Sequence, residues 1–259
     1  MAKKILSKRI DVSYANGKIN WESMKKNIDW AILRTGYGRD YTNQDDAQWK
    51  NNVAGCEKNN IPYGVYHYSY ATTVEAAKSE AKHAIRLLKG HKPGMPVFFD
   101  LEEARISQLG KAKILAIAKA FCAEIEKAGF QYGTYANKNW FQNYLTDKWY
   151  DNYPKWIAQY NSTCTYTGKY DIWQYSSSGT FSGYKCKFDM NYGYTSFLKG
   201  DVDGDGNVTA ADARKILRTS SNLEKLSGQE KVNADVNGDG KITAADARDA
   251  LRKSAKLDK

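Results

Sequence analysis

Short runs rich in β-branched and aromatic residues recur eight times in residues 1–199, and this recurrence limits the possible folds more than any other feature. Helical patterns separate the first five runs, as at 73–90 and 111–129, and both of these segments end in glycine, as many helices do. Strands that alternate with helices predict a parallel sheet, and eight such strands predict a closed barrel. The runs are KRIDVSY, WAILRTGYG, YGVYHYSY, MPVFFDLE, QYGTYAN, KWIAQY, DIWQYS and CKFDMNY.

The last three runs follow one another too closely for the same kind of connection. About ten residues separate Tyr160 from Asp171, and about ten separate Tyr175 from Lys185, whereas a parallel crossover needs a dozen or more. Hairpins are therefore expected between these runs. The predicted fold is α/β, an irregular (β/α)5(β)3 TIM-like barrel over residues 1–199, followed by a small all-α module over residues 200–259.

Carboxylates occur at the ends of three predicted strands. Asp100 and Glu102 are one residue apart at the end of the fourth run, and in a strand they would share a face. Asp11 and Asp189 lie in the first and eighth runs. Barrels of this class carry their sites at the carboxyl ends of the strands. Each acid alone could cap a turn, but together they predict four carboxylates around one mouth.

Seven motifs resemble, in order, those of the glycoside hydrolase family 25 lysozymes, over residues 5–197. They are RIDVSYANGKINW, WAILRTGYG, GVYHYSYA, VFFDLE, WIAQY, IWQYS and FDMNY. The resemblance implies an N-acetylmuramidase that needs no cofactor and hydrolyses the β-1,4 bond between N-acetylmuramic acid and N-acetylglucosamine in bacterial peptidoglycan. It also implies that Glu102 is the general acid, Asp100 its partner, and Asp11 and Asp189 supporting carboxylates.

The residue types suit this chemistry. Glycoside hydrolysis needs a protonated acid for the leaving oxygen and a negative charge near an oxocarbenium-like centre. Repulsion between crowded carboxylates raises the pKa of one while its neighbours stay ionised. Glu102, which has the longer reach, is predicted to donate the proton, and Asp100 to orient a substrate N-acetyl oxygen that attacks the anomeric carbon. A non-catalytic wall-binding protein and a chitinase-like glycosidase are the alternatives.

Aromatic residues are abundant, with 19 tyrosines and 7 tryptophans, and flat rings suit the faces of sugars. The candidates for substrate binding share positions near strand ends, although each could instead pack inside the barrel. They are Tyr37, Tyr66, Tyr68, Tyr135, Asn137, Trp156, Tyr160, Gln174 and Tyr192. The three histidines match no nucleophilic triad, and His67 is expected to be structural.

An internal repeat occupies residues 200–259, where DVDGDGNVTAADARKILR at 201 returns as DVNGDGKITAADARDALR at 235. Both copies fit the calcium-binding loop of an EF-hand, with glycine at the sixth position, so two structural Ca²⁺ ions are expected. The predicted ligands are Asp201, Asp203, Asp205, Asn207, Thr209 and Asp212 in the first loop, and Asp235, Asn237, Asp239, Lys241, Thr243 and Asp246 in the second. Asn207 and Lys241 would contribute backbone carbonyls.

Each repeat reads as a loop followed by a helix, with little room for a full entering helix before the second loop, and in this it resembles a dockerin. The resemblance implies that the module binds a cohesin domain of a scaffold protein. It also implies contacts from exposed positions of both repeats, in two interchangeable orientations. These positions are Ala210, Ala211, Leu217, Arg218, Ala244, Ala245, Leu251 and Arg252.

The formal net charge of +10 lies entirely in residues 1–199, because residues 200–259 contain 11 basic and 11 acidic residues. A basic surface suits a polyanion such as a teichoic acid, but no nucleic-acid motif is present. The sequence predicts no membrane span. The protein is expected to be a monomer. The sequence leaves open whether Cys164 and Cys186, which flank a short Tyr/Ser-rich segment, form a disulfide. Such a bond and the dockerin would favour a secreted protein, whereas a charged start without an apolar segment also suits a phage endolysin released at lysis.

Overall fold

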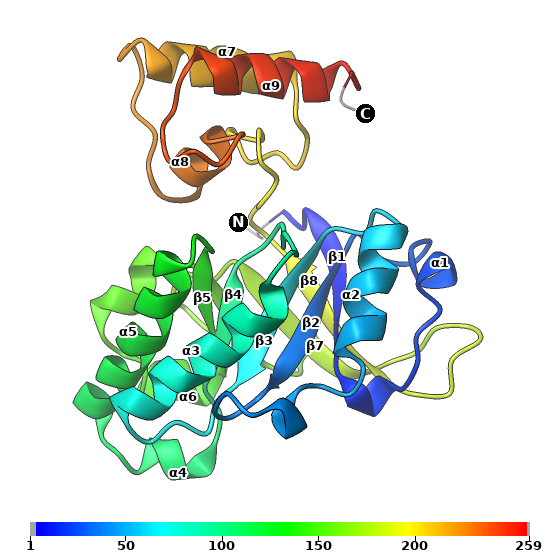
Figure 1. Cartoon of the computed structure of the whole chain (residues 1–259), viewed down its shortest axis with the longest axis vertical. Helices are drawn as coiled ribbons and strands as arrows, with labels where there is room; N and C mark the ends of the chain where they lie inside the picture. The colour runs from blue at the N-terminus through cyan, green and yellow to red at the C-terminus, as the bar shows by residue number, and fades with distance from the viewer. Residues whose placement is uncertain (1–3, 258–259) are drawn as a thin grey trace. The chain divides into compact units, whose positions relative to one another are not determined.

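The computed structural model describes residues 4–257, which form two compact units. One unit is Ser7–Gly193, and the other contains the described residues before Ser7 together with the segment from Tyr194 onward. Each unit buries its own set of apolar side chains. The two units are therefore described one at a time (Figure 1).

In the first unit the described residues form eight strands that close into a barrel in chain order, which confirms the predicted fold class. Strands β1 to β7 pair in parallel, and β8 is antiparallel to both β7 and β1. Their bounds are β1 Ser7–Val12, β2 Trp30–Tyr37, β3 Tyr63–Tyr68, β4 Val97–Asp100, β5 Tyr132–Asn137, β6 Lys155–Ala158, β7 Ile172–Gly179 and β8 Phe188–Gly193. Each of the eight predicted runs overlaps one of these strands.

Helices pack on the outside of the barrel, where α2 contacts β2, α3 contacts β2, and α5 contacts β4 and β5 (Figure 1). Helix α3 begins after Thr73, whose side chain accepts a hydrogen bond from the backbone amide of Ala76. Gly90 and Gly129, both with φ of 87°, follow α3 and α5, as predicted. The helices are α1 Trp21–Met24, α2 Trp49–Lys58, α3 Val74–Leu88, α4 Ala104–Ser107, α5 Lys111–Lys127 and α6 Lys138–Asn143, with 3-10 turns at Tyr14–Asn16, Thr42–Gln44 and Lys148–Asn152.

The predicted hairpin between the sixth and seventh strands is wrong, because β6 and β7 are parallel. Strand β6 ends at Ala158, two residues earlier than the run KWIAQY suggested, and β7 begins at Ile172. Residues 159–171 are therefore available for the connection, and this length is sufficient for a crossover without a helix. The hairpin between β7 and β8 is present, since these strands pair antiparallel.

The register of the strands determines which side chains face the barrel interior, because residues paired across neighbouring strands lie on the same face of a sheet. Trp156 on β6 is at the centre of this interior. Its ring centroid lies 5.5 Å from that of Phe98, 5.8 Å from that of Tyr66 and 4.4 Å from that of Tyr135. Gly133 leaves space for these rings, because a Cβ atom there would come within 2.7 Å of the Phe98 side chain. The interior of the barrel is thus filled with aromatic side chains, and polar residues lie at the carboxyl ends of the parallel strands, which form the mouth of the barrel.

The second unit contains three helices among its described residues, α7 Ala210–Ser220, α8 Gly228–Ala234 and α9 Ala244–Ser254. Helices α7 and α9 pack against each other, and each begins with a capping box in which Thr209 or Thr243 pairs with Asp212 or Asp246. The short α8 precedes the second loop, in agreement with the limited space expected there. The apolar core consists of Val202, Ala213, Ile216, Ala234, Ala247 and Ala250.

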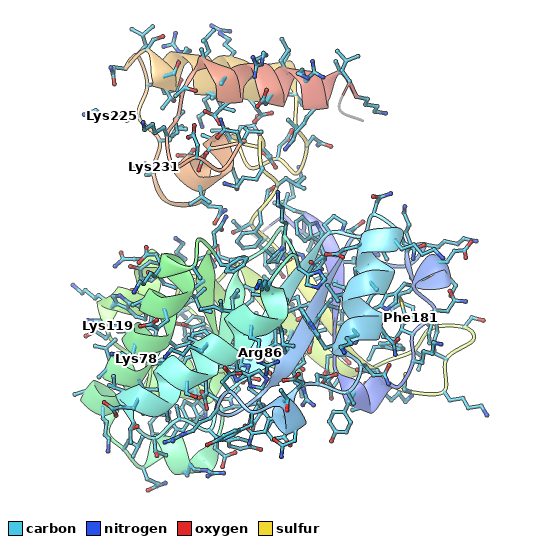
Figure 2. All side chains as sticks on the ribbon, in the orientation of Figure 1. Lys78, Arg86, Lys119, Phe181, Lys225 and Lys231 are labelled. Atoms are coloured by element: carbon cyan, nitrogen blue, oxygen red, sulfur yellow. The ribbon has the colours of Figure 1, made fainter. Side chains whose placement is uncertain are left out.

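All four cysteines are free thiols, so the disulfide that the sequence left open between Cys164 and Cys186 is not formed. The segment between these two residues contains β7, which belongs to the barrel wall. Basic side chains such as Lys78 on α3 and Lys119 on α5 extend from the outer helices (Figure 2). Over residues 4–257, no helix has the length and apolar character needed to cross a membrane.

Candidate functional site

The barrel register brings the predicted acids to one end of the barrel. Asp11 on β1 pairs with Asp189 on β8, and Asp100 at the end of β4 pairs with Tyr68 on β3 and Tyr135 on β5. Electrostatic interactions connect the four acids: Asp100 interacts with Glu102 and Asp11, and Glu102 interacts with Asp189. The structure therefore places all four predicted carboxylates in one cluster at the mouth.

Two acids reach this cluster by a different route from the one predicted. Asp189 lies at the beginning of β8, not at its end, and it is at the mouth because β8 runs antiparallel to β1. Glu102 lies two residues beyond the end of β4, so strand alternation does not determine its direction. Asp100 is 2% exposed, whereas Glu102 is partly exposed. Of the adjacent pair, Glu102 is thus the more accessible to a substrate.

Asp11 is held by a network of buried side-chain amides. Its Oδ2 atom accepts hydrogen bonds from Asn191 Nδ2 at 2.7 Å and from Gln174 Nε2 at 2.9 Å. Trp156 Nε1 donates to Asn191 Oδ1 at 2.7 Å, and Tyr135 donates its hydroxyl hydrogen to Gln174 Oε1 at 2.9 Å. The network fixes the carboxylate of Asp11 and orients the rings on either side of it. By contrast, Asp100 Oδ1 is buried and has no hydrogen-bond partner among the described residues.

Burial raises the pKa of all four acids and is the largest cause for each of them. Repulsion from Glu102 adds to the rise for Asp100, and repulsion from Asp189 adds to the rise for Asp11 and for Glu102. Crowding was expected to protonate a single member of the group. Instead, loss of hydration outweighs crowding and favours the protonated form of every member.

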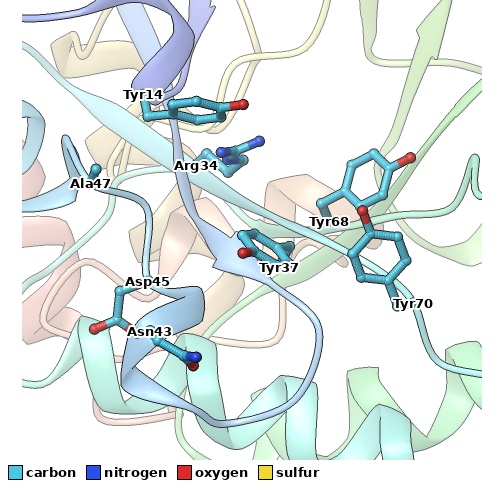
Figure 3. A pocket seen from close by; sticks show the side chains of 8 residues that line it. All are labelled: Tyr14, Arg34, Tyr37, Asn43, Asp45, Ala47, Tyr68 and Tyr70. Atoms are coloured by element: carbon cyan, nitrogen blue, oxygen red, sulfur yellow. The ribbon is translucent and has the colours of Figure 1, made fainter.

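A groove of about 520 Å³ lies at this mouth (Figure 3). Tyr68 joins the groove to the acids, because it lines the groove, pairs with Asp100 in the sheet and donates its hydroxyl hydrogen to Glu103 at 3.4 Å. Tyr37 and Tyr70 meet edge to face, with ring centroids 5.9 Å apart. The lining residues are Tyr14, Arg34, Tyr37, Asn43, Asp45, Ala47, Tyr68 and Tyr70. Tyrosine rings on several sides give this groove the character of a sugar-binding site.

The remaining predicted substrate-binding residues divide into two groups. Tyr66, Tyr135, Trp156 and Gln174 lie on the inner face of the barrel, and Tyr160 is 58% exposed and donates its hydroxyl hydrogen to Gln174 Oε1 at 3.1 Å. Two other predicted residues have different surroundings.

Tyr192 does not face the site. It alternates with Asn191 on β8, so it lies on the outer face, where its ring stacks on that of Tyr175 at 4.2 Å. Asn137 is at the end of β5, but its side-chain oxygen caps helix α6 by accepting a hydrogen bond from the Trp140 amide at 3.1 Å. The structure therefore does not bring Tyr192 to the predicted site, and the side-chain oxygen of Asn137 is used to cap α6.

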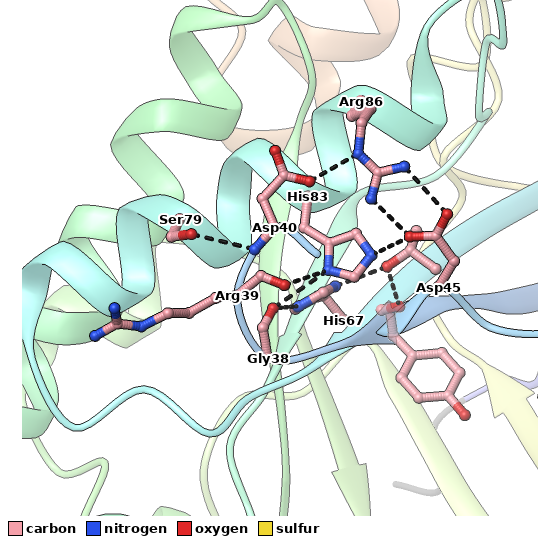
Figure 4. Close-up of polar contacts among 10 residues, drawn as sticks. Gly38, Arg39, Asp40, Asp45, His67, Ser79, His83 and Arg86 are labelled. Carbon is pink, nitrogen blue, oxygen red and sulfur yellow. Dashed lines mark hydrogen bonds and ion pairs between the residues drawn. The ribbon is translucent and has the colours of Figure 1, made fainter. Parts of the chain in front are cut away.

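An ion cluster supports the segment that carries Asn43, Asp45 and Ala47 (Figure 4). Asp45 accepts hydrogen bonds from His83 Nε2 at 2.7 Å and from Arg86 Nη2 at 2.6 Å, and both of these residues lie on α3. These bonds overcome the effect of burial and lower the pKa of Asp45. His67 is fully buried, contacts Thr35 and Gly38, and is structural as predicted.

Several site residues were not predicted from the sequence. Asn191 follows Asp189 by two positions in the same strand, so alternation would have placed both on one face. Tyr70 follows Tyr68 by two positions in the same way. Arg34 is the only charged residue in β2, and a single charge in an otherwise apolar strand indicates a functional position. No sequence signal places Tyr14 beside the groove, since it lies in a turn after β1.

In the second unit the residues fit the expected calcium loops. Carboxylate oxygens of Asp201, Asp203 and Asp205 lie within 4.8 Å of one another, as needed to coordinate a single ion. Gly206 and Gly240 have φ values of 97° and 83°, which a side chain would disfavour. The sets of oxygen donors suit a hard cation such as Ca²⁺.

The two loops also agree in their internal hydrogen bonds. Asp201 accepts from the amides of Gly204 and Gly206, and Asp235 accepts from those of Gly238 and Gly240. At the twelfth position, each aspartate accepts hydrogen bonds from two loop amides and from its helix-capping threonine: Asp212 from Val202, Asp203 and Thr209, and Asp246 from Val236, Asn237 and Thr243. The repeat seen in the sequence is thus repeated in the structure.

The residues predicted to bind a partner lie at or near the surface of α7 and α9. Leu217 is 49% exposed and Leu251 is 50% exposed, which is unusual for large apolar side chains on a helix that has a core to cover. Arg218 and Arg252 follow them and are also exposed. The paired alanines begin each helix, and Ala210, Ala211 and Ala244 are exposed while Ala245 is partly so.

Comparison with known proteins agrees with this architecture. The model of the glycosyl hydrolases family 25 matches residues 10–184, and that of the dockerin type I domain matches residues 199–249. Dockerin domains typically bind calcium. No curated protein matches the chain significantly.

Several solved structures are similar. The modular autolysin LytC from Streptococcus pneumoniae, in complex with a synthetic peptidoglycan ligand, is 26% identical with a TM-score of 0.65, over 72% of this chain and 46% of that chain. This chain therefore matches less than half the length of that autolysin. A family 25 glycosyl hydrolase from Bacillus anthracis is 23% identical with a TM-score of 0.63, over 75% and 90% of the two chains. The spore cortex lytic enzyme SleM from Clostridium perfringens is 20% identical with a TM-score of 0.66, over 74% and 69%. The family match spans more than half of the sequence and agrees with the barrel, so the chain belongs to the glycosyl hydrolases family 25.

Proposed function

We propose that this protein is a muramidase that hydrolyses the β-1,4 bond between N-acetylmuramic acid and N-acetylglucosamine in peptidoglycan. The observation that carries the proposal is the meeting of four carboxylates, from β1, from the end of β4 and the residues after it, and from β8, beside one tyrosine-lined groove. Burying such a cluster costs free energy of folding, and clusters of this kind are found mainly at functional sites. Membership of family 25 supports a glycoside hydrolase.

In this proposal Glu102 is the general acid. Its pKa is raised by burial and by Asp189, so it retains a proton closer to neutral pH than an ordinary glutamate, and it is more exposed than Asp100. Asp100, whose Oδ1 atom has no partner among the described residues, holds the substrate N-acetyl group so that its oxygen attacks the anomeric carbon. Asp11 and Asp189 are the supporting carboxylates in this proposal; because burial raises the pKa of both, they supply negative charge close to the developing oxocarbenium centre only in their ionised forms.

Clearing of Gram-positive cell walls tests the assignment. The native chain should reduce the turbidity of a wall suspension, and Glu102→Gln should reduce its rate by roughly 10²- to 10⁴-fold, as expected for loss of a general acid. Glu22→Gln is a matched control, since Glu22 is exposed on α1 and lies outside the assigned acids and the groove lining. Equal clearing by native and Glu102→Gln chains would refute the catalytic role and favour a wall-binding protein.

The second unit is proposed to bind two Ca²⁺ ions and a cohesin domain. The converging oxygens of the first loop and the equivalent bonds in the second support two ions. The exposed leucines on α7 and α9 support a docking surface that is present twice, so that either copy can face the partner. We further propose that residues 1–199 and 200–259 act as separate catalytic and attachment modules of an extracellular, monomeric enzyme; a phage endolysin is the alternative.

A further inference from the structure

One cation projects into the groove at the proposed active site. Arg34 lies on the inner face of β2, where it pairs with Tyr66, and its side chain is 14% exposed. The strand register shifts directly after it, between Arg34 and Gly36. Irregularities of this kind often occur beside active sites and change the direction of a side chain.

Two contacts fix the guanidinium group. Its Nε atom donates to Asp46 Oδ2 at 2.8 Å, and its Cζ atom lies 4.7 Å from the centre of the Tyr14 ring (Figure 3). Asp46 is 4% exposed and also accepts hydrogen bonds from the amides of Tyr14 and Gln48. The arginine is therefore positioned by a buried anchor and cannot easily turn away from the groove.

The two terminal nitrogens of Arg34 are left for a ligand, because among residues 4–257 its one hydrogen bond is made through Nε. The other ionised group lining the groove is Asp45, which is occupied by His83 and Arg86 (Figure 4). The charge of Asp45 is thus compensated by α3, and Arg34 faces the groove with an unused pair of donors. A fixed, planar pair of N–H groups matches the geometry of a carboxylate.

We propose that Arg34 forms an anion subsite that binds a carboxylate of the glycan substrate. The inference rests on the proposed muramidase function, because muramic acid differs from glucosamine in bearing a lactyl carboxyl group. Two sources would supply the same chemistry. In peptide-free strands it is the lactyl carboxylate, and in peptide-bearing strands, where the lactyl group is an amide, it is a carboxylate of the stem peptide.

Kinetics on chemically matched strands tests the subsite. The full-length native chain, Arg34→Gln, Arg34→Lys and the control Arg39→Gln are compared on four substrates: peptide-free strands, peptide-bearing strands, and each of these two with its carboxylates converted to methyl amides. Arg39 is exposed and lies outside the groove lining. Equal thermal unfolding temperatures of the four chains ensure that folding is preserved.

For the native chain we expect a KM roughly tenfold or more lower on charged than on neutralised strands, the size of a charge-assisted bidentate contact. Arg34→Gln should abolish that ratio with little change in kcat, Arg34→Lys should keep part of it, and Arg39→Gln should keep all of it. Discrimination confined to peptide-free strands identifies the lactyl group, and discrimination confined to peptide-bearing strands identifies the stem peptide.

A second readout separates this inference from the proposed function. Calorimetric titration of the Glu102→Gln chain with the N-acetylglucosamine–N-acetylmuramic acid disaccharide and with its methyl amide measures the charge preference without turnover. Preference for the acid, lost in the double variant with Arg34→Gln, supports the subsite even if the native chain cleaves no strand and the muramidase proposal fails. An unchanged ratio in Arg34→Gln overturns the subsite. So does a shifted pH–rate profile with unchanged KM, which would assign Arg34 to the ionisation of Asp100.

Discussion

Removal of the Asp45 carboxylate should destabilise the barrel unit far more than removal of the neighbouring Asp40 carboxylate. Asp45 accepts three hydrogen bonds, from His83 Nε2 at 2.7 Å and from Arg86 Nη1 and Nη2 at 3.1 and 2.6 Å. His83 is fully buried, and its Nδ1 faces the carbonyl oxygens of Gly38 and Arg39 at 3.3 and 3.0 Å. Asp45→Ala would therefore leave a buried imidazole N–H and an arginine without their acceptor (Figure 4).

The magnitude follows from exposure. The Asp45 side chain is 26% exposed and that of His83 is 0%, so we expect a loss in the free energy of unfolding of about 2–4 kcal/mol, at the lower end of the range for broken buried pairs. Asp40 accepts a single side-chain bond from Arg86, and both side chains are about one-third exposed. Asp40→Ala should therefore cost less than about 1 kcal/mol.

Urea denaturation of the full-length chain, followed by tryptophan fluorescence, measures both values. The pH dependence gives an independent check, because the pKa of Asp45 is lowered in the folded state. Its contribution should be fully present above the unfolded value, about 4, and should disappear as the pH falls through the lower folded value. Equal losses for Asp45→Ala and Asp40→Ala, or a difference that does not shrink in acid, would show that the reasoning is wrong.

Four further results are expected. Asn191→Leu removes a donor that lowers the pKa of Asp11, so the acid limb of the pH–rate profile should move to higher pH; an unmoved limb would argue against an ionised Asp11 in the reaction. Proton NMR of fresh product should show retention of anomeric configuration, and inversion would exclude attack by the N-acetyl oxygen. Calcium chelation should unfold the second unit but leave the barrel's calorimetric transition in place, and a calcium-insensitive scan would contradict the proposed ions. Leu217→Glu and Leu251→Glu should each preserve cohesin binding while the double variant loses it; loss in either single variant would rule out interchangeable surfaces.

Much of the fold could be predicted because it depends on local patterns. Eight β-rich runs and two glycine-terminated helical segments were sufficient to indicate the barrel, and the duplicated loop was sufficient to indicate the second unit. The ends of the strands could be predicted less accurately. The two-residue overestimate of β6 turned a parallel crossover into a hairpin in the prediction, since the number of available residues decides between them.

The candidate site divides in the same way. Asp11 and Asp100 could be placed from their positions near strand ends, whereas Asp189 reaches the mouth because β8 runs antiparallel to β1. Tyr192 lies three positions after Asp189 in the same strand, so alternation alone would have placed it on the outer face. Arg34 and Tyr14 meet through a cation–π contact between a strand and a turn, and this contact depends on tertiary packing. The pKa values of the acids depend mainly on burial, which becomes known only once the barrel is closed.

The reversed direction of β8 also determines where the barrel begins and ends. Ser7 at the start of β1 is paired with Gly193 at the end of β8, so the first and last barrel residues are neighbours on the floor, at the opposite end from the groove. Had the eighth strand been parallel, the chain would have emerged beside the groove. The barrel can therefore be circularly permuted by joining these neighbouring ends through a short linker and opening the chain elsewhere. Cargo fused to the barrel at either of these ends would leave the entrance to the groove clear.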